Sequence, residues 1–311
     1  MRALAMIALV AGCYDPHPAE GVPCTDDHTC PSGQTCVGTV CLAHDPNVDA
    51  PHGIDGHITP NDDDGDGVDN AVDNCPSVPN ADQANEDGDK FGDACDPCPV
   101  EANDLPSDPD GDGVADGCDP HPNTAGDKIV VFEGFANGIP TSWEVVGTTS
   151  VAAGTMSLTT VANNHTSVIA PGTFANATMT ASIQVDMQVG TFDSATTLTM
   201  PYDPGTDNGI FCELYAPMAT SPNNRELELY SSIDSVNMGD VGHMTFNWAL
   251  ATPYRVSLTR FGNKYTCTAL DGATTHSTNG NSSPTPPTSR AAVAVYGANA
   301  TVQWVMVVSS P

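Results

Sequence analysis

The distribution of apolar residues separates two kinds of sequence in this chain. From about residue 127 onward, short runs rich in Val, Thr, Ile and Tyr alternate apolar and polar positions between Gly, Pro and Asn. In 182–189 the apolar positions are Ile183, Val185, Met187 and Val189, and 226–229 and 255–259 follow the same rule. In 301–308 they are Val302, Trp304, Met306 and Val308, which we expect to form one face. A period of two residues predicts half-buried β-strands.

The length of this region favours a mainly β fold built as a two-sheet β-sandwich over 127–311. It has about 185 residues, ten or more expected strands and no convincing amphipathic helix. Cys212 and Cys267 are its only cysteines, and each lies in an expected strand, so a disulfide between them is the simplest expectation. An immunoglobulin-type sandwich is the alternative, although such domains have about 100 residues.

Residues 61–119 lack this alternation and are strongly acidic. They contain 19 Asp or Glu residues and a single basic residue, Lys90. Like charges at this density repel, and little apolar surface is present to form a core. We therefore expect cations to neutralise the carboxylates, with a disordered acidic linker as the alternative.

Three windows of this segment repeat one pattern, with side-chain oxygens at positions 1, 3, 5, 9 and 12 and a backbone carbonyl expected at position 7. The first consists of Asp62, Asp64, Asp66, Asn70 and Asp73, with the carbonyl of Val68. The second consists of Asn85, Asp87, Asp89, Asp93 and Asp96, with the carbonyl of Phe91. The third consists of Asp108, Asp110, Asp112, Asp116 and Asp119, with the carbonyl of Val114. This spacing predicts calcium loops, because Ca²⁺ takes six to eight oxygen ligands.

Details of the loops refine this prediction. Gly67 and Gly113 occupy the sharp turn of the first and third loops, whereas the second loop has Lys90 there and is expected to turn less regularly. Position 12 is Asp rather than Glu, and no amphipathic helices flank the loops. A helix–loop–helix sensor that opens a groove is therefore not expected.

A second repeat lies in the cysteines, because Cys75 and Cys95 are 20 residues apart, as are Cys98 and Cys118. Disulfides 75–95 and 98–118 would tie successive loops together. With Asp73-Asn74-Cys75-Pro76, Asn80-x-x-Gln83 and the run 87–96, the stretch resembles thrombospondin type 3 repeats over about 60 residues. The second half matches less fully, since no Asp-Asn precedes Cys98. The resemblance implies a coreless segment wrapped around calcium ions.

The C-terminal region has a resemblance of its own. Its motifs look, in their order along the chain, like parts of concanavalin A-like, laminin G-like domains. The opening strand and turn of that family resemble 132–135 and 139–143, the later hairpin resembles 254–267, and the closing strands resemble 293–307. The resemblance implies a jelly-roll β-sandwich at 127–311.

The N-terminal residues predict export. Arg2 and the apolar run Ala3–Val10 precede Val10-Ala11-Gly12-Cys13, which resembles a bacterial lipobox. We expect a signal peptide at 1–12, lipidated Cys13, a tether at 13–23, a cysteine-rich module at 24–41 with unresolved disulfide pairing, and a linker at 42–60. The predicted location is the bacterial cell envelope, at the outer membrane or cell surface. A plain secretory signal is the alternative, although it would leave an odd thiol among eleven cysteines.

Charge and motifs narrow the function. A formal net charge of −31 disfavours nucleic-acid partners. The chain lacks the E-x-D-x-x-E strand of jelly-roll glucanases, and Glu226-x-Glu228 is the nearest approach, interpreted as a solvent-facing strand edge. Trp143, Trp248 and Tyr254 could form a sugar-stacking face or lie in the core. The sequence predicts calcium-dependent binding or adhesion to glycan, matrix or cell-surface protein, without enzymatic activity. An extracellular polysaccharide hydrolase with an unrecognised site is the alternative.

Overall fold

The computed structural model describes residues 61–311 apart from 162–163, 190–192, 207, 218–223, 234–236 and 283–289, together with two short strands nearer the N-terminus. These are β1 (Thr35–Val37) and β2 (Val40–Leu42), an antiparallel pair. The predicted signal peptide, Cys13, the tether, and most of the cysteine-rich module and linker lie outside the described residues. The chain divides into two compact units, Met1–Gly56 and His57–Pro311. The second unit contains the acidic windows and all the remaining strands.

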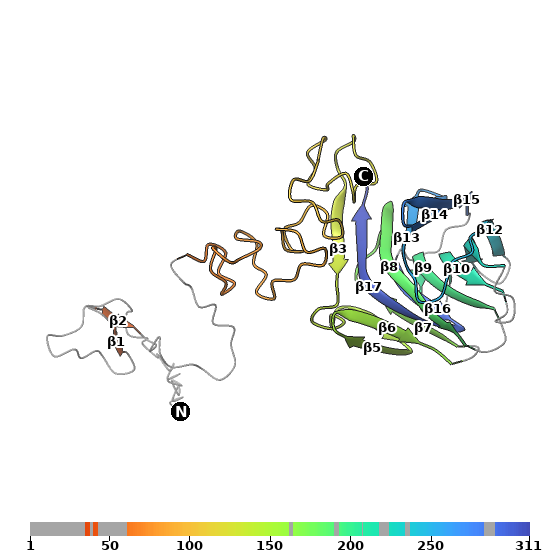
Figure 1. Cartoon of the computed structure of the whole chain (residues 1–311), viewed down its shortest axis with the longest axis horizontal. Coiled ribbons are helices and arrows are strands. Elements are labelled where there is room, and N and C mark those ends of the chain that lie inside the picture. The colour runs from red at the N-terminus through yellow and green to blue at the C-terminus, as the bar shows by residue number, and fades with distance from the viewer. Residues whose placement is uncertain are drawn as a thin grey trace, which may run out of the picture. The chain divides into compact units, whose positions relative to one another are not determined.

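Two antiparallel sheets form the C-terminal part (Figure 1). The seven-stranded sheet has the order β12-β11-β10-β9-β16-β7-β4. Its strands are β4 (Glu144–Val146), β7 (His165–Ile169), β9 (Ser194–Asp203), β10 (Asn208–Ala216), β11 (Glu226–Ile233), β12 (Asn237–Thr245) and β16 (Arg290–Tyr296). The second sheet has the order β15-β14-β13-β8-β17-β6-β5. Its strands are β5 (Thr148–Ala152), β6 (Thr155–Thr159), β8 (Ala177–Gln188), β13 (Pro253–Phe261), β14 (Lys264–Asp271), β15 (Thr274–Asn281) and β17 (Ala298–Ser309), and β3 (Lys128–Glu133) joins it beside β17.

This arrangement confirms the predicted mainly β fold. Neighbouring strands are often distant in sequence, as where β16 lies between β9 and β7. In the part of 127–311 that the structure describes, the fifteen strands β3–β17 exceed the seven to nine of an immunoglobulin-type sandwich, so that alternative is wrong. Among the described residues, no helix is long and apolar enough to cross a membrane.

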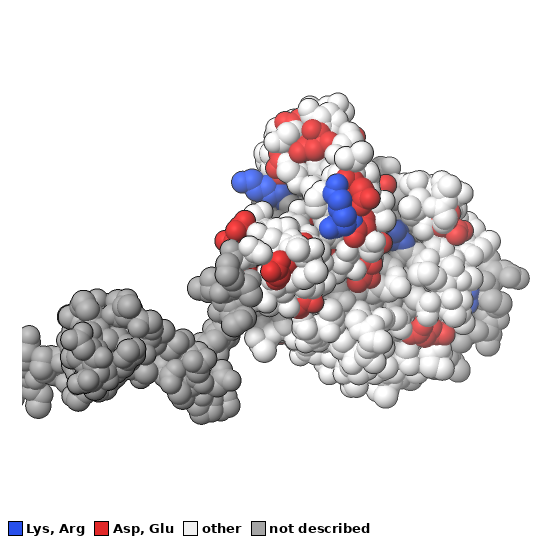
Figure 2. All heavy atoms as spheres, turned by 60° about the vertical axis from the view of Figure 1, so that its left-hand side comes forward, with Lys and Arg blue, Asp and Glu red and all other residues white. Residues whose placement is uncertain are grey.

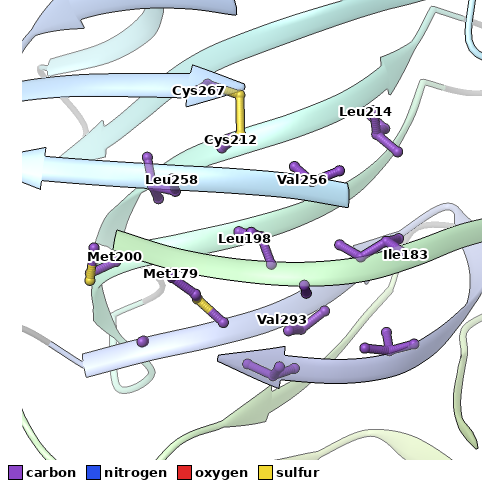
Figure 3. Close-up of a cluster of buried hydrophobic side chains, with 14 of the residues drawn as sticks. Met179, Ile183, Leu198, Met200, Cys212, Leu214, Val256, Leu258, Cys267 and Val293 are labelled. Atoms are coloured by element: carbon purple, nitrogen blue, oxygen red, sulfur yellow. A yellow bond between two sulfur atoms is a disulfide. The ribbon is translucent and has the colours of Figure 1, made fainter. Parts of the chain in front are cut away.

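The apolar core lies between the two sheets and follows the predicted alternation. Leu227 and Leu229 of β11 and Val256 and Leu258 of β13 are fully buried. The disulfide Cys212–Cys267 connects β10 to β14, and therefore one sheet to the other, within this core (Figure 3). Met187, expected on the same buried face, is 50% exposed because it lies at the end of β8, beyond the core.

The expectation that Val302, Trp304, Met306 and Val308 share one face is wrong. Val302 points into the inter-sheet core, whereas Trp304, Met306 and Val308 form a separate cluster. A shift in the pairing of β17 with β8 between Val302 and Val305 reverses the alternation, as an irregularity of one residue does in a strand. The last part of β17 is therefore buried on both faces.

The acidic segment covers the outer face of this part of β17. Val100 and Cys118 pack against the cluster of Trp304, Met306 and Val308. An Nη atom of Arg255 on β13 donates to the carbonyl of Val100 at 2.9 Å. Farther along, Asn137 Nδ2 donates to Asp82 Oδ2 at 2.7 Å. The sequence did not predict this contact, which makes the repeats part of the same compact unit as the sandwich (Figure 1).

Candidate metal centres and binding pocket

The acidic segment, 61–127, consists of turns held by carboxylates that repeat every 23 residues. Asp66, Asp89 and Asp112, at position 5 of the three loops, each accept from the backbone N–H two residues later. Each also accepts at its other oxygen from the N–H fourteen residues later, at Asn80, Asn103 and Gly126 respectively. Successive loops are therefore linked by the same pair of bonds. The disulfides Cys75–Cys95 and Cys98–Cys118 are present and repeat with the same interval.

Position 1 shapes the turn of each loop. Asp62 accepts from the N–H groups of Gly65 and Gly67, and Asp108 accepts from those of Gly111 and Gly113. Gly67 and Gly113 have φ of +94° and +96°, where a side chain would be strained. In the second loop the N–H of Lys90 donates to Asp104 rather than to the position-1 residue. The expected irregularity of that turn is thus observed, and it follows from the residue at the glycine position.

The loops bring three groups of carboxylates together. Within each group, one oxygen from every member lies within 4.8 Å of the others. The groups are Asp62, Asp64 and Asp66; Asp87, Asp89 and Asp96; and Asp108, Asp110 and Asp112. Figure 2 shows acidic side chains gathered on one side of the compact unit, while most of the rest of its visible surface is white.

Other predicted ligands lie differently. At position 9, Asn70 and Asp93 accept from the backbone N–H groups of Asp63 and Glu86, and Asp116 is exposed. Neither Asp93 nor Asp116 belongs to one of the three carboxylate groups. The N–H groups of Val68, Phe91 and Val114 donate to the position-5 carboxylates, and metal ligation by their carbonyl oxygens stays a prediction.

Several carboxylate oxygens of these loops are buried without a hydrogen-bond partner. They belong to Asp64, Asp73, Asp87, Asp96, Asp110, Asp119 and Asp127. Burial, as the main cause, raises the pKa of Asp96 and of Asp119 to about 6. Unpaired buried carboxylates are costly unless a cation or a proton neutralises them. Clusters of hard oxygen atoms of this kind fit Ca²⁺.

A different candidate site lies on the outer face of the seven-stranded sheet. Residues of β7, β9, β10, β11 and β16 line a pocket of about 460 Å³. Its walls are partly aromatic, because Phe211 and Tyr230 pack with ring centroids 6.3 Å apart and Tyr215 lies nearby. Three carboxyl groups line it, those of Asp193, Glu213 and Glu228. Such a mixture of aromatic walls and a few polar groups is typical of small-ligand sites.

Glu213 and Glu228 face each other across β10 and β11, where they are direct partners in the strand register. Burial, followed by the charge of Glu228, raises the pKa of Glu213 to about 8. Burial, followed by the charge of Asp240, raises the pKa of Glu228 to about 7. At neutral pH the pair therefore holds at least one proton, and it can both donate and accept hydrogen bonds.

Sequence reasoning missed this pair. It treated Glu228 as part of a solvent-facing edge and did not consider Glu213. The only available signal was the strand pairing, which alternation within one strand does not reveal. Of the two alternatives for Trp143, Trp248 and Tyr254, a sugar-stacking face or the core, the structure shows the core, with exposures of 8%, 1% and 4%.

Comparisons with known proteins agree with the calcium loops. Residues 56–83 match the family model described as Thrombospondin type 3 repeat, which confirms that resemblance. No curated protein matches the chain.

Similar solved structures include a carbohydrate-binding module, CBM66 from Bacillus subtilis, with 13% identity and a TM-score of 0.42 over 52% of this chain and 92% of that one. The VIP36 exoplasmic/lumenal domain bound to Ca²⁺ and Man3GlcNAc has 12% identity and a TM-score of 0.43 over 55% of this chain and 84% of that one. Peanut lectin has 12% identity and a TM-score of 0.44 over 60% of this chain and 98% of that one.

Proposed function

We propose that this protein binds carbohydrate in the pocket on the seven-stranded sheet, and that calcium holds its acidic repeats folded against the other sheet. The observation that carries the binding role is the pocket itself. Phe211, Tyr215 and Tyr230 supply apolar rings, and Glu213 and Glu228 supply hydrogen-bonding oxygens between them. A sugar ring presents apolar C–H faces and polar hydroxyl edges, and such a pocket complements both.

The calcium part of the proposal rests on the loops. Buried oxygens without partners at Asp64, Asp87 and Asp110 belong to the three carboxylate groups. The ions are structural in this proposal, because the loops lie against β3 and β17 while the pocket is lined by strands of the other sheet. Calcium would then not contact the sugar, and it would affect sugar binding only by stabilising the folded sandwich.

A glycan array followed by calorimetric titration of the best glycan tests the pocket. We expect Tyr230→Ala to weaken glycan binding by about tenfold, because an aromatic contact contributes about 0.5–1.5 kcal/mol in addition to the apolar area that the ring buries. Glu226→Gln is the control, since Glu226 is on the same strand and face as Glu228 but is not among the residues lining the pocket. Equal affinity of wild type and Tyr230→Ala would contradict the assignment, as would an array without any binding.

Polysaccharide hydrolysis is the second candidate, favoured specifically by the cross-strand pair. Glycosidases use two carboxyl groups, one protonated to donate to the leaving oxygen and one ionised to activate water or attack the sugar. The pKa values of about 8 and about 7 suit Glu213 for the first role and Glu228 for the second.

A panel of polysaccharides assayed for new reducing ends distinguishes the two candidates. Turnover by wild type that disappears in Glu213→Gln and Glu228→Gln but survives in Glu226→Gln would establish the hydrolase. Binding without turnover on every polysaccharide that binds would support recognition alone.

The lipid anchor belongs to this proposal as well. The lipobox-like sequence ending at Cys13 supports cleavage before Cys13, acylation of its thiol and amine, and a location at the bacterial cell envelope. Mass spectrometry of the N-terminal peptide from a bacterial host tests it. We expect a diacylated or triacylated Cys13 peptide, and an unmodified Cys13 or cleavage elsewhere would contradict the anchor.

A further inference from the structure

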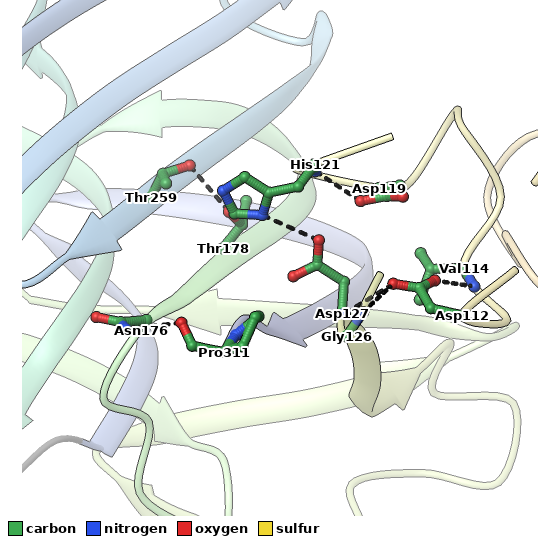
Figure 4. A network of polar contacts seen from close by, with 10 residues as sticks. All are labelled: Asp112, Val114, Asp119, His121, Gly126, Asp127, Asn176, Thr178, Thr259 and Pro311. Carbon is green, nitrogen blue, oxygen red and sulfur yellow. Dashed lines mark hydrogen bonds and ion pairs between the residues drawn. The ribbon is translucent and has the colours of Figure 1, made fainter. Parts of the chain in front are cut away.

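The last acidic loop continues into the sandwich at Asp127, which directly precedes β3. Asp127 is completely buried. Its N–H donates to Asp112 Oδ2 at 2.7 Å, next to the N–H of Gly126, which donates to the same oxygen at 2.9 Å (Figure 4). Position 5 of the third loop therefore holds the first residue of the sandwich in place.

His121 organises two carboxylates at this junction. The backbone N–H of His121 donates to Asp119 Oδ1 at 2.6 Å, and the imidazole Nδ1 of His121 lies 2.9 Å from Asp127 Oδ2. Each carboxylate thus uses one oxygen on His121. The other oxygens, Asp119 Oδ2 and Asp127 Oδ1, are buried and have no hydrogen-bond partner. The imidazole is itself held by an edge contact with Phe261 of β13, with ring centroids 6.4 Å apart.

The three carboxylates converge. One oxygen each from Asp112, Asp119 and Asp127 lies within 4.8 Å of the others. Asp112 is also a member of the group with Asp108 and Asp110, so it lies between two clusters. A fully buried carboxylate that has an unpaired oxygen and lies beside two further carboxylates is costly unless a cation or a proton neutralises the group.

We propose that Asp112, Asp119 and Asp127 bind a divalent cation, calcium in an extracellular medium, that fastens the last repeat to the sandwich. This cation is additional to the ion at Asp108, Asp110 and Asp112, and Asp127 supplies a ligand from outside the three predicted loops. The inference rests on the proposal that the repeats bind calcium. Its consequence is that calcium stabilises the start of β3, and through the pairing of β3 with β17 it stabilises the sandwich.

The test is the number of calcium ions per chain. The full chain is equilibrated in buffered calcium, gel-filtered and measured by elemental mass spectrometry, and the affinities are obtained by calorimetric titration. Asp127→Asn keeps the size of the side chain and removes its charge. We expect this variant to bind one ion fewer per chain, or one site to weaken by at least about tenfold.

Glu101→Gln is the control. Glu101 is an exposed carboxylate of the same acidic segment and belongs to no carboxylate group. We expect this variant to keep the wild-type ion count. An ion count and affinities unchanged in Asp127→Asn would overturn the inference and leave the proposed calcium loops intact. Absence of calcium from wild type would instead refute the calcium part of the proposed function.

A second measurement does not depend on the variant folding. Anomalous diffraction from calcium-grown crystals of the wild type locates each ion directly. We expect a calcium peak within ligand distance, about 2.3–2.6 Å, of oxygens from Asp112, Asp119 and Asp127. Occupied loops without a peak at this junction would overturn the inference.

Discussion

Trp304 offers the sharpest test of how the repeats stabilise the sandwich. It lies on the outer face of β17 with 7% of its surface exposed, covered by the repeats near Val100 and Cys118. Arg255 lies over its ring, 5.6 Å from the centroid. If calcium holds the repeats in place, a chelator should uncover Trp304 while leaving the inter-sheet core packed.

The expected magnitudes differ between the two conditions. In calcium, Trp304→Ala should lower the free energy of unfolding of the sandwich by about 3–5 kcal/mol, as for a buried aromatic side chain. In chelator, the same substitution removes a side chain that is largely exposed and should cost about 1 kcal/mol or less. The cost should therefore fall by at least about 2 kcal/mol when calcium is removed.

Urea unfolding with intact disulfides, followed by the β-sheet signal in circular dichroism, measures both values. Trp143→Ala is the matched control, because Trp143 is 8% exposed but packs against Phe135 in the inter-sheet core. Its cost should be the same with and without calcium. An equal cost for Trp304→Ala in both conditions would refute the reasoning, because the repeats would then cover β17 without calcium.

Three further predictions concern separate parts of the molecule. Replacing Cys212 and Cys267 together by Ala should lower the free energy of unfolding by about 4 kcal/mol, since the disulfide closes a loop with a sequence separation of 55; an unchanged urea midpoint would contradict this. The raised pKa of Glu213, about 8, means that the unfolded chain releases a proton that the folded chain keeps, so this group's contribution to stability falls as pH rises from about 4.5 to 8. The fall is at most about 1.4 kcal/mol per pH unit, and Glu213→Gln, but not Glu226→Gln, should remove it in thermal unfolding at constant calcium. Asp64→Ala should weaken one calcium site in calorimetric titration, whereas Asp63→Ala, an exposed neighbour, should not.

Patterns within a single strand or loop predicted the features that depend on residues close in sequence. Alternation in 226–229 and 255–259 placed Leu227, Leu229, Val256 and Leu258 correctly, because β11 pairs regularly with β10, β13 pairs regularly with β8 and β14, and each strand has one face in the core. The carboxylates at positions 3 and 5 of each loop lie together, as residues this close in sequence can, and metal binding by the predicted ligands stays a prediction. Lys90 at the glycine position predicted the altered turn of the second loop.

The features that the sequence did not predict depend on contacts between segments that are distant in the chain. The shift in β17 pairing after Val302 has no signature in a strand read alone, although the unbroken apolar run from Trp304 to Val308 is typical of a strand buried on both faces. Glu213 meets Glu228, and Asp127 meets Asp112 and Asp119, only once the strands and loops have folded. Spacing within one motif cannot reveal either site.

Hydrogen–deuterium exchange of the full chain, with disulfides intact, tests most directly whether calcium rather than an apolar core of their own orders the repeats. In calcium we expect slow exchange of the loop N–H groups that donate to Asp66, Asp89 and Asp112. In chelator we expect exchange to accelerate throughout 61–127 and at β3, while β8, β10 and β13 stay protected by the inter-sheet core. Protection of 61–127 that is the same in calcium and in chelator would contradict the account.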